Sequence, residues 1–244
     1  MNYFEIKTYT PRGGKGEFIK DYHYIGSVLS ESFLGNLNPY AKIDIHPVIP
    51  TVEIGAGYSI PDILIPGGPI SGRFILSSLL KKILDSYGAE RLIQYFPIKI
   101  IQEGKSFNDY WITQFLSFDN SLLDFSKCVF TEKITIYESN GYVITKRTTQ
   151  NHERTFESEE ELSNRMDELY EEGNSISYKN LYIYDSCNLD IVLIEDNLCQ
   201  GIIVSENLKS KLEQIDFKGI EFKPLKIPDE EWYGPNGLRK QFYN

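Results

Sequence analysis

The chain has 244 residues, of which 41% are hydrophobic and 25% are charged, and its net charge is −10. These values are typical of a protein with its own core, and they argue against intrinsic disorder. The negative charge opposes binding to nucleic-acid phosphates and to anionic lipid, and it favours basic partners. We therefore expect an acidic, soluble protein that binds neither nucleic acid nor membrane.

The N-terminal stretch MNYFEIKTYTPRGGKG lacks the basic region and apolar run of a signal peptide. No later segment approaches the roughly 18 apolar residues that a membrane-spanning helix requires. The cysteines Cys128, Cys187 and Cys199 are odd in number and lack CxxC spacing, which favours buried thiols in a reducing compartment. The expected location is the cytoplasm.

The first fifty residues predict β-strands over 3–9, 23–29 and 43–49, because glycine and proline separate short apolar runs there. This part of the chain is expected to be rich in strands and loops.

An internal repeat follows: Pro61–Leu84 aligns without gaps with Leu189–Leu212, at an offset of 128 residues. Each copy contains two short apolar strands, a serine, a helix with leucines four residues apart, and a closing strand. The serines, Ser77 and Ser205, stand where a side-chain oxygen can accept from the free N–H groups of the first helical turn, which predicts N-caps. The sequence thus predicts two similar ββαβ units; the alternative is a chance similarity between two ordinary strand–helix–strand units.

The region between the copies has mostly β character. Strands are predicted over 110–118 and 128–138, and the turn Ser139-Asn140-Gly141 predicts a hairpin that returns over 142–147. The residues expected on one face of the second strand are Cys128, Phe130, Ile134 and Ile136.

One acidic amphipathic helix is predicted next, beginning at the capping-box spacing of Ser158–Glu161 and ending near Gly173. Its expected apolar stripe consists of Leu162, Met166, Leu169 and Tyr170. The segment Glu153–Glu172 holds nine acidic residues and two arginines, so it carries −7 of the total charge of −10. Its exposed carboxylates are the candidate partner-binding residues, although a solvated face that only aids solubility remains the alternative. The candidates are Glu159, Glu160, Asp167, Glu168, Glu171 and Glu172.

Together these elements predict an α+β fold with mixed, mostly antiparallel sheets, few helices and two similar ββαβ units. We predict an N-terminal lobe over residues 1–105 with the first unit, and a C-terminal lobe over residues 106–244 with the hairpin, the acidic helix and the second unit.

Residue patterns of catalytic sites are missing. His23, His46 and His152 are scattered without zinc-ligand spacing, and neither a GxSxG elbow nor a GxGxxG turn after a strand is present. His152 beside Glu153 is the best remaining acid–base candidate, and a carboxylate-dependent hydrolase stays open as an alternative. We predict that the protein is not an enzyme and uses no cofactor or metal.

Three segments resemble bacterial immunity proteins of polymorphic toxin systems, in a group whose C-terminal domain was long described as of unknown function. They are Tyr110–Leu116 (YWITQFL), Leu122–Ser126 (LLDFS) and Val204–Ile227 (VSENLKSKLEQIDFKGIEFKPLKI), and the resemblance spans residues 104–227. It implies a protein that binds and neutralises a cognate toxin encoded beside it. Many such toxins are nucleases with a basic surface, which an acidic inhibitor complements. A scaffold or regulatory binding module without a toxin is the alternative, and the oligomeric state stays open.

Overall fold

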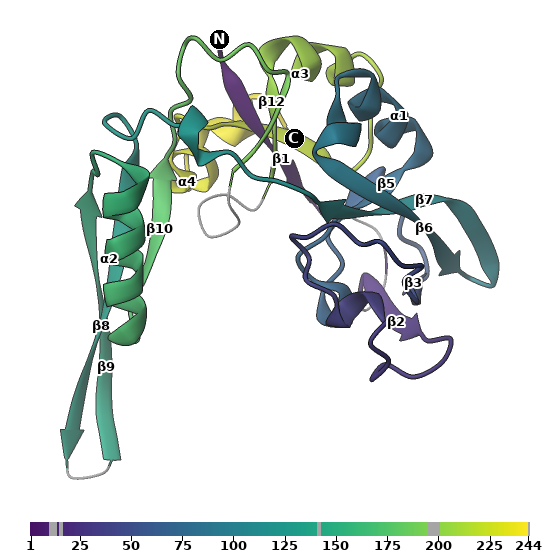
Figure 1. Ribbon diagram of the computed structural model, residues 1–244, viewed down its shortest axis with the longest axis horizontal. Coiled ribbons are helices and arrows are strands. Elements are labelled where there is room, and N and C mark those ends of the chain that lie inside the picture. The colour runs from purple at the N-terminus through teal and green to yellow at the C-terminus, as the bar shows by residue number, and fades with distance from the viewer. Residues whose placement is uncertain (10–13, 15–16, 141–142, 195–200, 244) are drawn as a thin grey trace.

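The computed structural model describes residues 1–9, 14, 17–140, 143–194 and 201–243. The fold is α+β with mostly antiparallel sheets, as the sequence predicted. Figure 1 shows an arch, in which a three-stranded sheet with one helix forms one limb and a six-stranded sheet forms the other. A four-stranded sheet that contains the N-terminal strand joins the two limbs.

The strands of the six-stranded sheet are β2 (Ile19–His23), β3 (Thr51–Ile54), β4 (Ile63–Leu64), β5 (Ile75–Ser77), β6 (Ile93–Gln102) and β7 (Lys105–Phe115). Those of the four-stranded sheet are β1 (Tyr3–Thr8), β11 (Ile191–Leu193), β12 (Ile202–Ser205) and β13 (Ile220–Pro224). The third sheet contains β8 (Val129–Asn140), β9 (Val143–Arg154) and β10 (Ser175–Asn180). The helices are α1 (Ser78–Ser86), α2 (Glu159–Glu171), α3 (Glu206–Glu213) and α4 (Asp229–Tyr233). The strand orders are β2-β3-β6-β7-β5-β4, β11-β12-β1-β13 and β10-β8-β9.

The two ββαβ units predicted from the repeat are confirmed. In the first unit Ile63 of β4 lies opposite Leu76 of β5, and in the second Ile191 of β11 lies opposite Val204 of β12. Both pairs keep the offset of 128 residues, so the repeat preserves strand register as well as residue type. The units then continue through α1 to β6 and through α3 to β13.

In each unit a strand from outside the ββαβ repeat lies between the second and third strands of the repeat; we call it the central strand, and its place in the chain differs between the two units. In the first unit β7 lies between β5 and β6, with Tyr110 opposite Ser77. In the second unit β1 lies between β12 and β13, with Tyr3 opposite Ser205. The second unit is therefore a circularly permuted version of the first, since its central strand precedes the others in the chain.

The equivalence extends to charged side chains. Lys81 binds Asp85 on α1 at 2.6 Å, and Lys209 binds Glu213 on α3 at 2.8 Å, again 128 residues apart. Each lysine also lies over two rings of the neighbouring sheet, which are Tyr95 and Trp111 for Lys81, and Phe222 and Phe4 for Lys209. Such matched ion pairs and cation–π contacts favour a duplicated unit over chance similarity.

The two units share one hydrophobic core. Leu80 and Leu84 of α1 and Leu208 and Leu212 of α3 are buried in the same cluster, together with apolar residues of both sheets. Burial of each such leucine contributes about 1.5–3 kcal/mol, so this core holds the two units together. The division into lobes 1–105 and 106–244 stays a prediction, but strand pairing crosses between them. Strand β1 belongs to the sheet of the second unit, and β7, which lies almost wholly beyond residue 105, belongs to the sheet of the first.

Both predicted N-caps are present. The Ser77 hydroxyl accepts a hydrogen bond from the Leu80 N–H at 3.3 Å, and the Ser205 hydroxyl accepts one from the Leu208 N–H at 3.2 Å. Each replacement, Ser77→Ala or Ser205→Ala, is expected to lower the free energy of unfolding by about 1 kcal/mol, because one buried donor loses its acceptor. Urea denaturation measures this loss, and an unchanged midpoint for both variants would contradict the capping role.

Two strand predictions near the N-terminus are wrong. Residues 23–29 are not a strand, because Gly26 adopts a φ of 92° and the Ser27 hydroxyl accepts from the Leu29 N–H, which turns the chain. Residues 43–49 make only the isolated bridge from Val48 to Phe33, and the nearby prolines cannot donate to a sheet. The strands observed there are β2 and β3.

The hairpin of β8 and β9 is longer than predicted, since β9 continues to Arg154; the turn residues 141–142 lie outside the described residues. Pairing of β8 with β10 ends at Lys133, so the distal hairpin projects from the limb (Figure 1). On the face predicted to hold Cys128, Phe130 and Ile136, the first two residues are buried, whereas Ile136 is exposed because no third strand pairs at its level.

The C-terminal segment forms α4, and Trp232 of this helix is 1% exposed. Among the described residues, no helix combines the length and apolar character needed to cross a membrane.

Candidate partner-binding surface

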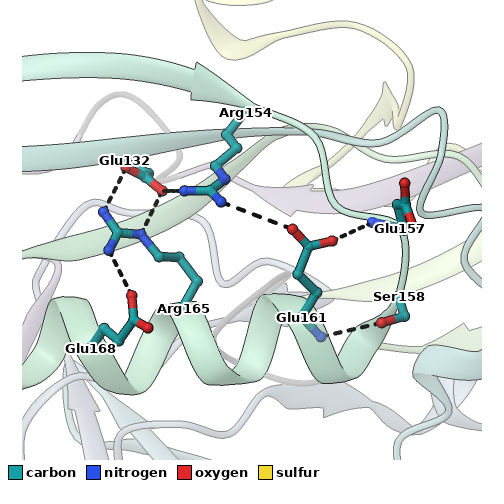
Figure 2. A network of polar contacts seen from close by, with 7 residues as sticks. All are labelled: Glu132, Arg154, Glu157, Ser158, Glu161, Arg165 and Glu168. Carbon is teal, nitrogen blue, oxygen red and sulfur yellow. Dashed lines mark hydrogen bonds and ion pairs between the residues drawn. The ribbon is translucent and has the colours of Figure 1, made fainter.

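The acidic helix α2 forms as predicted, and its N-terminus is well capped. The Ser158 hydroxyl accepts from the Glu161 N–H at 3.2 Å, and the Glu161 carboxylate accepts from the Glu157 N–H at 2.8 Å (Figure 2). Leu162 and Leu169 are buried against the sheet, so the helix presents a fixed opposite face to solvent.

A buried carboxylate attaches α2 to the sheet. Glu132 of β8 is 5% exposed, and it accepts hydrogen bonds from Arg165 of α2 at 2.9 and 3.1 Å and from Arg154 of β9 at 3.3 Å (Figure 2). The hydrogen bonds from Arg165 are the main reason why the pKa of Glu132 lies below its usual value. We call these three residues the Glu132 ion-pair cluster.

The Glu132 ion-pair cluster holds the positive charges of the acidic segment on one side of α2, apart from the carboxylates on the other side. Both arginines of Glu153–Glu172 reach Glu132 on the sheet side of the helix. On the opposite side, Glu160, Asp167 and Glu171 are exposed, and within the described parts of the chain no cation pairs with them. The seven-residue and four-residue spacings of these carboxylates place them in one stripe along α2.

The other three predicted carboxylates have partners within the protein. Glu159 accepts from the Asn120 amide at 2.9 Å, and Glu172 accepts from the Asn174 amide at 3.1 Å. Glu168 accepts from Arg165 at 2.8 Å. The six candidates therefore divide into three that are held by neighbours and three that line the outer side of the helix.

Tyr170 was predicted in the apolar stripe, and this is wrong, because it is 83% exposed. At about 100° per residue, Tyr170 lies roughly 90° from the direction of the buried positions 162 and 169, so it is on the flank of the helix, one turn from Asp167. We define the outer face of α2 as Glu160, Asp167, Tyr170 and Glu171.

A groove lies where the two limbs meet. A pocket of about 450 Å³ is lined by Tyr40, Arg73, Phe115 and Phe118, among others, and a second of about 440 Å³ is lined by Tyr40, Phe118, Asp119, Asn120 and Glu159, among others. Because both are lined by Tyr40 and Phe118, they adjoin, and we call the pair the junction groove. It begins among apolar residues and ends at the N-terminus of α2.

Arg73 is a buried cation in the wall of this groove. Its guanidinium donates to the Gln114 side chain at 3.2 Å and to the carbonyls of Leu34 and Leu37 at 3.1 and 2.9 Å. These acceptors are neutral, and burial lowers the pKa of Arg73 to about 10. The apolar end of the junction groove therefore has a positive wall, whereas its other end has the carboxylates Asp119 and Glu159.

Among the described residues, His23 of β2 and Glu53 of β3 form a histidine–carboxylate contact of 2.6 Å, which lies outside the larger pocket. Among the described residues lining the larger pocket there is no Asp, Glu, His or Cys. The acid–base candidates His152 and Glu153 have different surroundings. His152 is exposed on β9, and the Glu153 carboxylate binds the Lys179 ammonium at 2.5 Å. Within the described ranges, no group of three or more His, Cys, Asp or Glu residues could hold a metal ion.

The cysteines are placed as buried thiols where they are described. Cys128 and Cys187 are buried and unpaired, while Cys199 lies outside the described residues. Burial raises the pKa of the Cys128 thiol to about 11, so it stays protonated and unreactive near neutral pH.

The geometry thus assembles an acidic helix face with one exposed aromatic ring, and an adjoining groove of mixed character. No protein-family model matches the chain, and no curated protein shows significant similarity to it.

Proposed function

We propose that the protein is an immunity protein, which binds a cognate bacterial toxin domain and neutralises it by occupying a basic functional surface of that toxin. The observation that carries this proposal is the separation of charge around α2, where both arginines of the segment reach Glu132 and the outer carboxylates face solvent. A helix that served only solubility would not need this separation.

The outer face of α2 has the features of a docking surface. Tyr170 presents a large, amphipathic ring at 83% exposure, and tyrosine is among the residues that contribute most to binding energy at protein interfaces. Asp167 and Glu171 flank it and would steer a basic partner into contact. The Glu132 ion-pair cluster fixes the helix before binding, which lowers the entropic cost of association.

A basic nuclease surface is the partner that fits this face best. A toxin that holds nucleic acid needs lysines and arginines at its active site, and an acidic helix laid across them excludes the substrate. The proposal needs no cofactor and no turnover, and it places the protein in the cytoplasm of the cell that makes the toxin.

Co-expression tests the proposed function. The chain is expressed together with the C-terminal domain encoded by the adjacent reading frame, in cells whose growth that domain arrests. We expect growth to be restored and the two proteins to purify together. Arrested growth with both proteins folded and present would contradict the proposal, and a bound neighbour that lacks toxicity would favour a scaffold instead.

The replacement Tyr170→Ala is expected to weaken toxin binding by about tenfold or more, because the ring is the main apolar contact of the outer face. Stability should change by less than about 0.5 kcal/mol, since the side chain is exposed. Binding is measured by calorimetry and stability by urea denaturation. Tyr184→Ala, at an exposed tyrosine outside α2, serves as the control and should bind as the wild type does.

A further inference from the structure

We propose that the junction groove receives an extended segment of the protein partner, in which an apolar side chain enters the larger pocket and a neighbouring arginine or lysine reaches Asp119 and Glu159. This inference rests on the proposed function for the identity of the partner. It adds a second contact region, distinct from the outer face of α2.

The apolar part of the groove is suited to a side chain from outside. Its wall includes Phe115, Phe118 and Tyr40. The rings of Tyr40 and Phe118 pack edge to face, with their centroids 5.3 Å apart. Ile65 lines the same pocket and is 49% exposed, so it offers an apolar contact at the rim. A volume of about 450 Å³ accommodates an aromatic or branched side chain with its flanking backbone.

The acidic end of the groove can still accept hydrogen bonds. Asp119 is exposed and accepts from the N–H and the hydroxyl of Ser121, both through one oxygen. Glu159 accepts from Asn120 through one oxygen. An ionised carboxylate has about four acceptor positions, so both groups retain capacity for a guanidinium or an ammonium.

The two ends of the groove fix the orientation of the bound segment. Arg73 makes the apolar end positive and repels a basic side chain there, whereas Asp119 and Glu159 attract one at the other end. Because Glu160 of the outer face follows Glu159 directly in α2, one basic partner can contact both surfaces at once.

Filling the pocket tests the inference. Gly67 lines the larger pocket, its φ of −82° suits any residue, and an added Cβ would meet no atom within 4 Å. Gly67→Phe should therefore add a ring at the lining of the pocket without a clash of its Cβ, and we expect it to weaken binding of the toxin domain by tenfold or more. Leu29→Phe, which adds a ring at an exposed residue outside both pockets, is the control and should bind as the wild type does.

A second variant tests the acidic end. Glu159→Gln keeps an acceptor for Asn120 but removes the charge, and it should weaken binding several-fold at low salt. Toxin affinity equal to that of the wild type in both Gly67→Phe and Glu159→Gln would overturn the inference. If Gly67→Phe lowers the melting temperature, Ile65→Ser at the exposed rim replaces it, with the same expected loss and the same contradicting result. Failure of the wild-type protein itself to bind the toxin would contradict the proposed function, so the two outcomes are distinguishable.

Discussion

Replacing Glu160, Asp167 and Glu171 together by lysine is expected to slow association with the toxin domain by about tenfold to a hundredfold at low salt. These carboxylates have no cationic neighbour among the described residues, so their field extends into solvent and accelerates the approach of a basic surface. The association rate constant is measured by stopped-flow fluorescence over a range of salt concentrations. The difference from the wild type should shrink towards 1 M salt, where the Debye length falls to about 3 Å.

A matched control separates local steering from total charge. The triple replacement of Glu31, Glu90 and Asp109 by lysine makes the same change in net charge. These three residues are exposed in the limb of the six-stranded sheet and its loops, outside α2 and the hairpin. We expect this control to slow association much less. Equal slowing by both triple variants would show that only the net charge matters and would reject the outer face of α2 as the docking surface.

Glu132→Ala is expected to lower the free energy of unfolding by about 2–4 kcal/mol, because two arginines lose the buried carboxylate that attaches α2 to the sheet. Glu168→Ala is the control. Glu168 also accepts from Arg165, but its side chain is 64% exposed, so its loss should cost less than about 1 kcal/mol. Urea denaturation compares the two variants, and equal losses would contradict the central role of Glu132.

Acid provides a second measurement of the same cluster. The hydrogen bonds from Arg165 hold the pKa of Glu132 below that of an unfolded glutamate, so the stabilisation is complete above the unfolded pKa and is lost as the pH falls through the folded one. Between about pH 5 and pH 3 the wild type should therefore lose stability more steeply than Glu132→Gln. Parallel pH profiles for the two proteins would contradict this assignment.

The repeat explains why much of the fold could be predicted. Residues that follow one another closely, such as Ser77 with Leu80 and Ser205 with Leu208, encode strands, caps and helices through local chemistry, and the structure confirms them. The pairing of β1 and β7 within the two sheets was not predictable in this way, because neither segment carries a local signal that identifies its partner strands. Ile6 of β1 and Phe115 of β7 are both buried in the shared core around α1 and α3, so contacts between distant parts of the chain contribute to the placement of both strands.

The candidate surface was predictable only in part. The acidic helix and its carboxylates follow from composition and periodicity, whereas their availability depends on where two arginines point. Arg165 is 33 residues from Glu132 in the chain, and Arg154 comes from another strand, so the Glu132 ion-pair cluster appears only in three dimensions. The junction groove likewise combines Tyr40 with Glu159, which no local pattern connects.

Titration of the toxin with the purified protein distinguishes stoichiometric docking from catalysis, because the two give different curves. We predict that toxin activity falls linearly and reaches zero near one equivalent of the protein, without further change over time. Loss of toxin activity that continues over time at a small fraction of an equivalent would show turnover, and it would contradict a protein that acts by binding alone.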